Sequence, residues 1–61
     1  MGSKLKELRK AKGFSQERLA KITGISRVSI ARYETGVAVP NMKNARKLAE
    51  ALECSIDDIA R

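Results

Sequence analysis

The sequence predicts an all-α fold, a compact bundle of five short helices, from three observations. Ser15 and Ser26 each stand directly before a run of helix-forming residues, where a serine hydroxyl can accept a hydrogen bond from the first turn. Gly24 and Gly36 follow these runs, and glycine ends a helix in the left-handed conformation without a Cβ penalty. Apolar residues recur at helical spacing in residues 42–52. We therefore expect helices over about residues 4–12, 16–23, 27–34, 42–52 and 56–60, in a single domain of residues 1–61.

The composition excludes several classes of protein. A chain of 61 residues makes one small domain, which buries only roughly 60 % of the surface of its unfolded chain. The single cysteine, Cys54, cannot form an intrachain disulfide, and without histidine we expect no metal site and no cofactor. No stretch approaches the roughly 18 apolar residues of a membrane span, so we expect no membrane partner.

The candidate catalytic residues are also explained without catalysis. Cys54 has no neighbouring base and is interpreted as a small buried hydrophobe. Asp57 and Asp58 are adjacent at a helix start, where carboxylates complement the helix dipole. We therefore expect that the chain is not an enzyme.

Positive charge is concentrated near the start of the chain. The net charge is +6, and residues 1–12 hold five Lys or Arg against one Glu, a net +4. Residues 51–61 hold three acidic residues against one Arg, a net −2. Such a balance favours an anionic partner, usually nucleic acid, although lysines can also simply solvate a small domain.

The first expected helix, residues 4–12, has Leu5 and Leu8 three positions apart on the face toward the core. Its lysines lie outward. Gly13 follows as the stop signal of this helix.

The second expected helix comprises residues 16–23. Phe14 before its cap and Leu19 after it stand at the two positions of a hydrophobic staple. Its inward face is expected to hold Leu19, Ala20 and Ile22.

The third expected helix, residues 27–34, follows after a tight turn at Gly24. Ile25 and Ile30 repeat the staple around its N-cap. Two short capped helices joined by such a turn match a helix-turn-helix.

One face of the third helix is free to meet a partner. With Ile30 and Tyr33 inward, a rotation of 100° per residue places Val28, Arg32 and Thr35 on the opposite face.

The order of these landmarks resembles the helix-turn-helix of the lambda-type phage repressor and Cro family, the XRE-like transcriptional regulators. The matching positions are Gln16, Ala20, Gly24, Ile30 and Tyr33, then Glu34-Thr35-Gly36, Pro40, Leu48-Ala49, Leu52 and Ser55-Ile56-Asp57. The resemblance covers about residues 4–60 and implies a lambda repressor-like DNA-binding domain with residues 27–34 as the recognition helix.

The resemblance also implies roles for polar residues of the first two helices. It implies that Arg9 forms a structural ion pair with Glu34 and lies near a DNA phosphate, and that Gln16 bonds a phosphate oxygen. From the residues alone, Arg9 could equally be a solvated charge and Gln16 an exposed helix former.

In the family's mode of docking, the N-terminal end of the third helix enters the major groove. Arg27 and Arg32 would each donate two hydrogen bonds to a guanine. Val28 would pack on a thymine methyl group, or is an ordinary exposed apolar residue. Backbone or supporting contacts are expected from Ser26, Ser29, Thr35, Asn41 and Lys43.

The loop of residues 37–40 departs from the family, which often carries lysine or arginine here. Val39 is restricted to an extended conformation by Pro40, and the loop is apolar. Its backbone N–H groups would meet a phosphate, or Val37 and Val39 would pack against a second subunit. The second interpretation requires that these valines do not fold onto their own core. This loop and the C-terminal segment Leu52 to Ile59 are the two candidate dimer interfaces.

Asn41 is the expected cap of the fourth helix, and Ser55 with Asp58 caps the last one. The core stripe of the fourth helix is expected to be Met42, Ala45, Leu48, Ala49 and Leu52. Glu53 stands where the family often has glycine, so it is left-handed at some cost or the turn differs.

These observations together predict a sequence-specific regulator of transcription that binds double-stranded DNA. The resemblance implies a repressor that binds a palindromic operator as a homodimer, is cytoplasmic and nucleoid-associated, and needs no small-molecule ligand. The alternative is an interaction module of the same fold, an antitoxin or antirepressor partner, that does not read DNA itself.

Overall fold

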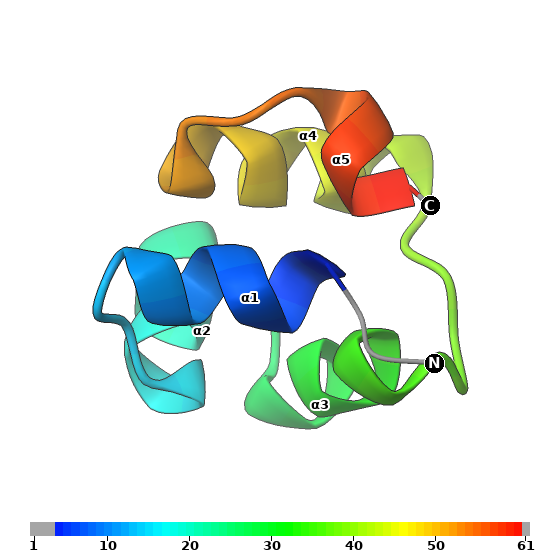
Figure 1. The fold of residues 1–61 in the computed structure, drawn as a ribbon. Helices are drawn as coiled ribbons and strands as arrows, with labels where there is room; N and C mark the ends of the chain where they lie inside the picture. Colours follow the sequence, from blue (N-terminus) through cyan, green and yellow to red (C-terminus); the bar gives the residue numbers. More distant parts are fainter. Residues whose placement is uncertain (1–3, 61) are drawn as a thin grey trace.

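A computed structural model describes residues 4–60, and this part of the chain contains five α-helices and no β-strand (Figure 1). The helices are α1 (Lys4–Ala11), α2 (Gln16–Thr23), α3 (Arg27–Thr35), α4 (Met42–Leu52) and α5 (Ile56–Ala60). The predicted all-α class is confirmed. The predicted domain also includes residues 1–3 and 61, which lie outside the described range.

Two helix ends differ from the prediction by one residue. The first helix ends at Ala11 rather than at residue 12, because Gly13 is left-handed and the N–H of Phe14 closes the turn on the carbonyl of Arg9 at 3.1 Å. The third helix continues through Thr35 and ends at Gly36, whose φ of 81° is left-handed.

The helices pack around one aliphatic core. In the view of Figure 1, α1 crosses the front, with α3 below it and α4 and α5 above it. Helix α4 packs against α2 and α5, α1 packs against α3 and α5, and α2 packs against α3. Each of the first four helices contributes one large side chain that is almost fully buried: Leu5, Leu19, Ile30 and Leu48. Leu52, Ile59 and Ile25 are buried beside them. Burying such a side chain contributes roughly 1.5–3 kcal/mol, so these residues together account for most of the apolar stabilisation of a small domain.

Two residues predicted for the core are exposed. Ile22 is 46 % exposed, because Thr23 rather than Ile22 takes the inward position one turn after Leu19. The Thr23 hydroxyl donates to the Leu19 carbonyl at 2.8 Å and accepts from the N–H of Ile25 at 3.2 Å, so it is buried without an unsatisfied group. Met42 is 64 % exposed, since it is the first residue of α4 and that helix meets the core only from Ala45 onward.

The predicted N-caps are all present. Ser15, Ser26 and Asn41 accept from the backbone N–H three residues later, at 3.0, 3.1 and 2.8 Å. Ser55 and Asp58 form a reciprocal pair at the start of α5. Hydrogen bonding by Ser55 lowers the pKa of the Asp58 carboxyl below its usual value.

Cys54 is half-buried and packs against the core. Burial raises the pKa of its thiol, and the charge of Asp58 raises this pKa further. Both effects disfavour the thiolate, in keeping with the interpretation of Cys54 as a small buried hydrophobe.

None of the helices within residues 4–60 combines the length and the apolar character needed to cross a membrane.

The turn between α4 and α5 holds a non-glycine residue in the left-handed region. Glu53 has φ 54° and ψ 48°, and its carboxylate pairs with Lys12. The hydrogen bond and charge of Lys12 lower the pKa of Glu53. Since this carboxylate is exposed to water, the ion pair is a weak compensation for a strained backbone.

We therefore expect Glu53→Gly to stabilise the domain, because glycine adopts this conformation without strain. The backbone strain that is relieved should outweigh two losses, the ion pair with Lys12 and the greater conformational entropy of glycine in the unfolded chain. The urea midpoint of unfolding should therefore rise by about 0.5 M. Glu53→Gln is the control, since it removes the charge and keeps the strain. A midpoint for Glu53→Gly below that of Glu53→Gln would contradict the argument.

Candidate nucleic-acid interface

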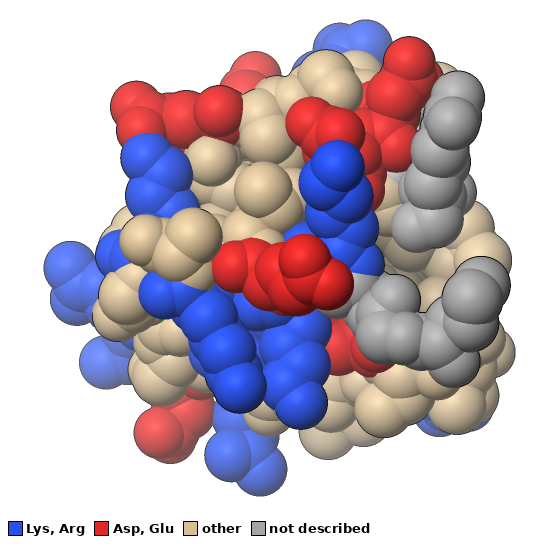
Figure 2. Space-filling model, viewed as in Figure 1, with Lys and Arg blue, Asp and Glu red and all other residues tan. Residues whose placement is uncertain are grey.

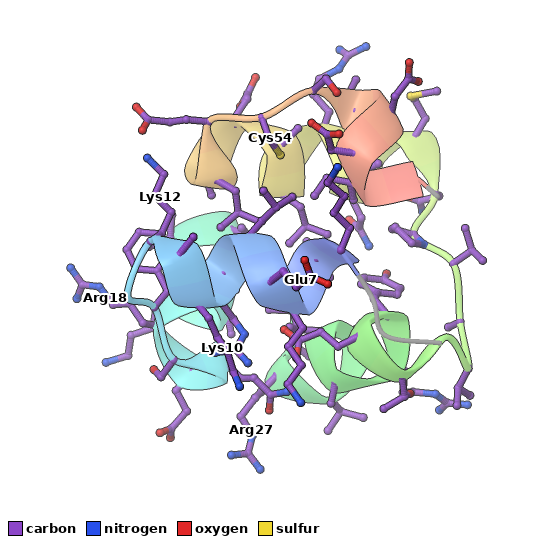
Figure 3. All side chains as sticks on the ribbon, in the orientation of Figure 1. Glu7, Lys10, Lys12, Arg18, Arg27 and Cys54 are labelled. Atoms are coloured by element: carbon purple, nitrogen blue, oxygen red, sulfur yellow. The ribbon has the colours of Figure 1, made fainter. Side chains whose placement is uncertain are left out.

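Helix α3 has a buried face and a free face. Ile30 is fully buried and Tyr33 is half-buried against the core, whereas Arg27, Val28 and Arg32 are exposed. Val28 is 65 % exposed. Among residues 4–60, neither arginine side chain has a hydrogen-bond or ion-pair partner. Figure 3 shows Arg27 pointing away from the body of the molecule.

A hydrogen bond that the sequence did not indicate fixes α3 to α4. The side-chain amide of Asn44 donates to the Tyr33 hydroxyl at 2.9 Å. The Asn44 backbone N–H is itself held by the cap residue Asn41. The orientation of α3 is therefore coupled to the start of α4.

A buried ion pair holds the C-terminal end of α3. Arg9 Nε donates to Glu34 Oε2 at 2.6 Å, and Arg9 Nη2 donates to Oε1 at 3.3 Å. The side chains are only 9 % and 3 % exposed. Arg9 Nη1 also donates to the Phe14 carbonyl at 2.7 Å, so this guanidinium serves α1, the following turn and α3 together.

Gln16 is part of the same cluster. Its amide Nε2 donates to Glu34 Oε1 at 3.1 Å, and the side chain is half-buried at the start of α2. One of the two amide N–H groups is used in this bond, and the second remains available to an acceptor outside the protein.

This cluster determines the charge that α3 presents to solvent. Glu34 is the only acidic residue of α3, and its charge is buried and compensated by Arg9. The exposed charges of α3 are therefore those of Arg27 and Arg32, both positive. A surface of one sign with exposed guanidinium groups suits an anionic partner.

The other predicted contact residues lie at the start and end of α3 and at the start of α4. Ser26 caps α3 and donates its hydroxyl to Ser29 Oγ at 3.0 Å, which leaves the Ser29 hydroxyl proton free. Thr35 is exposed and donates to the Arg32 carbonyl at 3.2 Å. Asn41 and Lys43 are exposed at the first turn of α4, and Asn41 is partly used as its cap.

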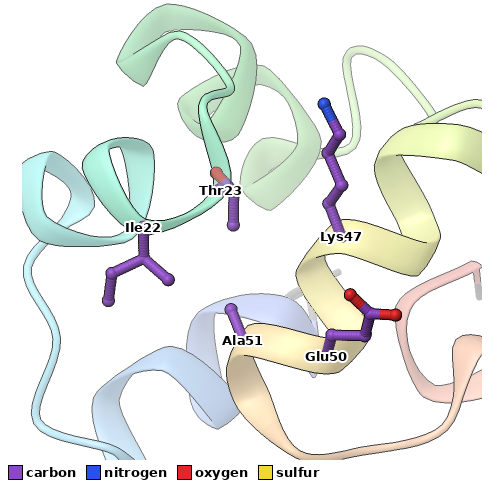
Figure 4. A pocket seen from close by; sticks show the side chains of 5 residues that line it. All are labelled: Ile22, Thr23, Lys47, Glu50 and Ala51. Carbon is purple, nitrogen blue, oxygen red and sulfur yellow. The ribbon is translucent and has the colours of Figure 1, made fainter.

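A pocket lies elsewhere, between α2 and α4 (Figure 4). It has a volume of about 300 Å³ and is open to solvent, and the exposed side chain of Ile22 lies in its lining. The lining residues are Ile22, Thr23, Lys47, Glu50 and Ala51. The lining includes no arginine of α3, so the pocket is separate from the candidate interface. Within residues 4–60 no cluster of potential metal ligands is present.

Comparison with known proteins finds a helix-turn-helix family model and relatives that are named as regulators or repressors of transcription. The helix-turn-helix family model HTH_3 matches residues 5–59. The chain is 43 % identical over 56 residues to the SPbeta prophage-derived uncharacterized HTH-type transcriptional regulator YonR of Bacillus subtilis, covering 92 % of this chain and 52 % of YonR. It is also 43 % identical over 56 residues to the cryptic phage CTXphi transcriptional repressor RstR of Vibrio cholerae, covering 92 % and 50 %. The chain thus spans about half the length of these two curated relatives.

A solved structure is similar over nearly all of both chains. The crystal structure of the restriction-modification controller protein C.AhdI from Aeromonas hydrophila superimposes with a TM-score of 0.84 at 39 % identity. The match covers 92 % of this chain and 85 % of that one.

The buried pair generates a stability prediction. Glu34→Leu leaves the Arg9 charge buried without its counter-charge, which should cost about 3 kcal/mol or more of unfolding free energy. The double variant Arg9→Met/Glu34→Leu should recover most of this loss, because no charge is then left buried. Urea unfolding of the wild type and the variants measures both effects.

Glu7→Leu is the matched control, since Glu7 is an exposed glutamate of α1 without an ion pair among the described residues. Its stability should stay close to that of the wild type. A double variant as unstable as Glu34→Leu would contradict the account of an uncompensated charge.

Proposed function

Because the chain belongs to the helix-turn-helix (HTH_3) family, we propose that it is a transcriptional regulator that binds double-stranded DNA sequence-specifically and represses by occupying its operator. The single observation that carries the proposal is the free face of α3, where Arg27 and Arg32 are exposed beside Val28 and have no side-chain partner in the part of the chain that the structure describes. The proposed activity is binding, not catalysis.

In the proposed complex, α3 lies in the major groove with its N-terminal end toward the bases. Arg27 and Arg32 each donate two hydrogen bonds to guanine O6 and N7, and Val28 packs on a thymine methyl group. The packing of Ile30 and Tyr33 on the core supports this proposal. A helix held in this way presents its exposed side chains to the bases in a fixed orientation.

Phosphate contacts position the domain on the duplex. Gln16 donates its second amide N–H to a phosphate while Glu34 holds the first. Ser29, Thr35, Asn41 and Lys43 add contacts around α3. Arg9 is buried, so its part is to hold Glu34 and through it Gln16 and α3, rather than to reach the DNA directly.

The proposed regulator is a homodimer on a palindromic site. Two recognition helices would lie about 34 Å apart, one turn of DNA, and a single module contacts too few base pairs to select one site in a genome. The candidate interface is the apolar loop between α3 and α4, where Val37 is 67 % and Val39 is 75 % exposed. Leu52 and Ile59, by contrast, are buried in the core of the protomer. We propose that the protein acts in the cytoplasm, at the nucleoid.

The role of the two arginines is tested after selection of a preferred duplex from a random pool. Arg27→Ala and Arg32→Ala should each weaken binding to the selected duplex by roughly 5- to 150-fold, the equivalent of one lost bidentate contact. Binding to a scrambled duplex should fall much less. Fluorescence anisotropy at fixed salt measures both affinities, and circular dichroism verifies the fold.

Arg18→Ala is the matched control. Arg18 is an exposed arginine of α2 and points to the side in Figure 3, in a different direction from Arg27. Its removal should change both duplex affinities little and equally. Wild-type affinity of Arg27→Ala/Arg32→Ala for the selected duplex would overturn the proposal and favour an interaction module that does not read DNA.

The dimer interface is tested separately. Val37→Ser/Val39→Ser should leave the unfolding free energy nearly unchanged, since neither valine is in the core, and should lower the dimer fraction at a given concentration. Analytical ultracentrifugation measures the fraction. Ile22→Ser is the control, because Ile22 is an exposed apolar residue at the pocket between α2 and α4. This variant should have the dimer fraction of the wild type. The same dimer fraction in all three proteins would exclude this loop as the interface.

A further inference from the structure

The lysines of the N-terminal segment divide into two groups by their partners. Lys4 pairs with Asp58 at 3.5 Å, and Lys12 pairs with Glu53. Lys6 and Lys10 are exposed, and within residues 4–60 their side chains have no hydrogen bond or ion pair. Both lysines that have an ion pair are thus matched to acidic residues after α4, Glu53 and Asp58.

The two groups lie in opposite rotational directions from Arg9, which points from α1 to Glu34 of α3. At 100° per residue, Lys6 lies 60° and Lys10 100° from Arg9 in one direction. In the other direction Lys4 lies 140° away, and Lys12, just after the end of α1, lies 60° away on a continued helix and pairs with Glu53. Lys6 and Lys10 are one turn apart and form a short ridge along α1.

The figures agree with this placement. In Figure 3, Lys10 leaves α1 toward the side where Arg27 projects from α3. Figure 2 shows Lys and Arg side chains gathered below α1, on the side of α3, with more of the acidic side chains near α4 and α5.

We propose that Lys6 and Lys10 are a second DNA-contacting site, a ridge on α1 that binds the phosphate backbone of the duplex whose bases α3 reads. The inference rests on the proposed function and adds a surface to it. A lysine ammonium is a compact, hydrated point charge on a flexible stem, which suits a phosphate without a fixed geometry. Such contacts add affinity and salt dependence but carry no sequence information.

One acidic group opposes the ridge on the same helix. Glu7 is exposed between Lys6 and Lys10 in the sequence, 60° around the helix from Lys10, and has no ion pair in the described range. It reduces the positive potential of the ridge without occupying either ammonium. Its removal should therefore act in the opposite sense to removal of the lysines.

The test is the salt dependence of DNA binding by Lys6→Gln/Lys10→Gln, whose glutamines preserve helix propensity. Log affinity falls as log salt rises, and each phosphate contact makes this slope steeper by about 0.9. Loss of two contacts should therefore make the slope shallower by about 1.8 per protomer. The ratio of wild-type to variant affinity should then shrink about twelvefold per protomer between about 50 and 200 mM salt. The variant should lose the same factor of affinity for the selected and the scrambled duplex. The α3 arginine variants, by contrast, should lose affinity mainly for the selected duplex.

Lys4→Gln/Lys12→Gln is the matched control, because it removes two positive charges from the same segment at lysines that already pair with Asp58 and Glu53. Its slope of log affinity against log salt should equal that of the wild type. Glu7→Gln should raise affinity for both duplexes. A wild-type slope for Lys6→Gln/Lys10→Gln, or a loss confined to the selected duplex, would overturn this inference and leave the proposed function intact. A wild-type protein that binds neither duplex would overturn both.

Discussion

Two charges buried together, those of Arg9 and Glu34, tie the first helix to the end of α3. A buried charge is tolerated only with a partner and satisfied hydrogen bonds, and here Glu34 accepts from Arg9 and Gln16 while Arg9 also donates to the Phe14 carbonyl. The bonds fix α1, the start of α2 and the end of α3 relative to one another. The free face of α3 owes its position to this cluster as much as to the apolar residues behind it.

The same cluster decides the sign of the surface. Three of the acidic side chains are matched to cations of the N-terminal segment: Glu34 to Arg9, Glu53 to Lys12 and Asp58 to Lys4. The arginines of α3 have no such partner among residues 4–60. The cations without an ion pair in the described range include Arg27 and Arg32 of α3 and Lys6 and Lys10 of α1. Others lie on α2 and α4: Arg18, Lys21, Lys43, Arg46 and Lys47.

The apolar residues show a similar division. A domain of this size has a small core, which here consists of leucines and isoleucines from all five helices and the α2–α3 turn, with Ala45 and Ala49 between them. Val28, Val37 and Val39 remain outside it. Two of them lie in one loop next to the end of α3, which is why this loop is the proposed dimer interface. The third, Val28, lies on α3 next to Arg27.

The helices, their caps and the turn of the helix-turn-helix could be predicted from the sequence, because these features depend on residues three or four positions apart. Ser15, Gly24 and Asn41 act locally, and the exposed face of α3 followed from helical periodicity around Ile30. Three contacts became visible once the helices were packed: Thr23 rather than Ile22 faces inward, Asn44 bonds Tyr33, and Lys12 meets Glu53, 41 positions away. The Arg9–Glu34 pair was suggested by family resemblance and not by spacing. Such contacts depend on the angles at which the helices cross. The residue pattern along one helix carries no information on these crossing angles.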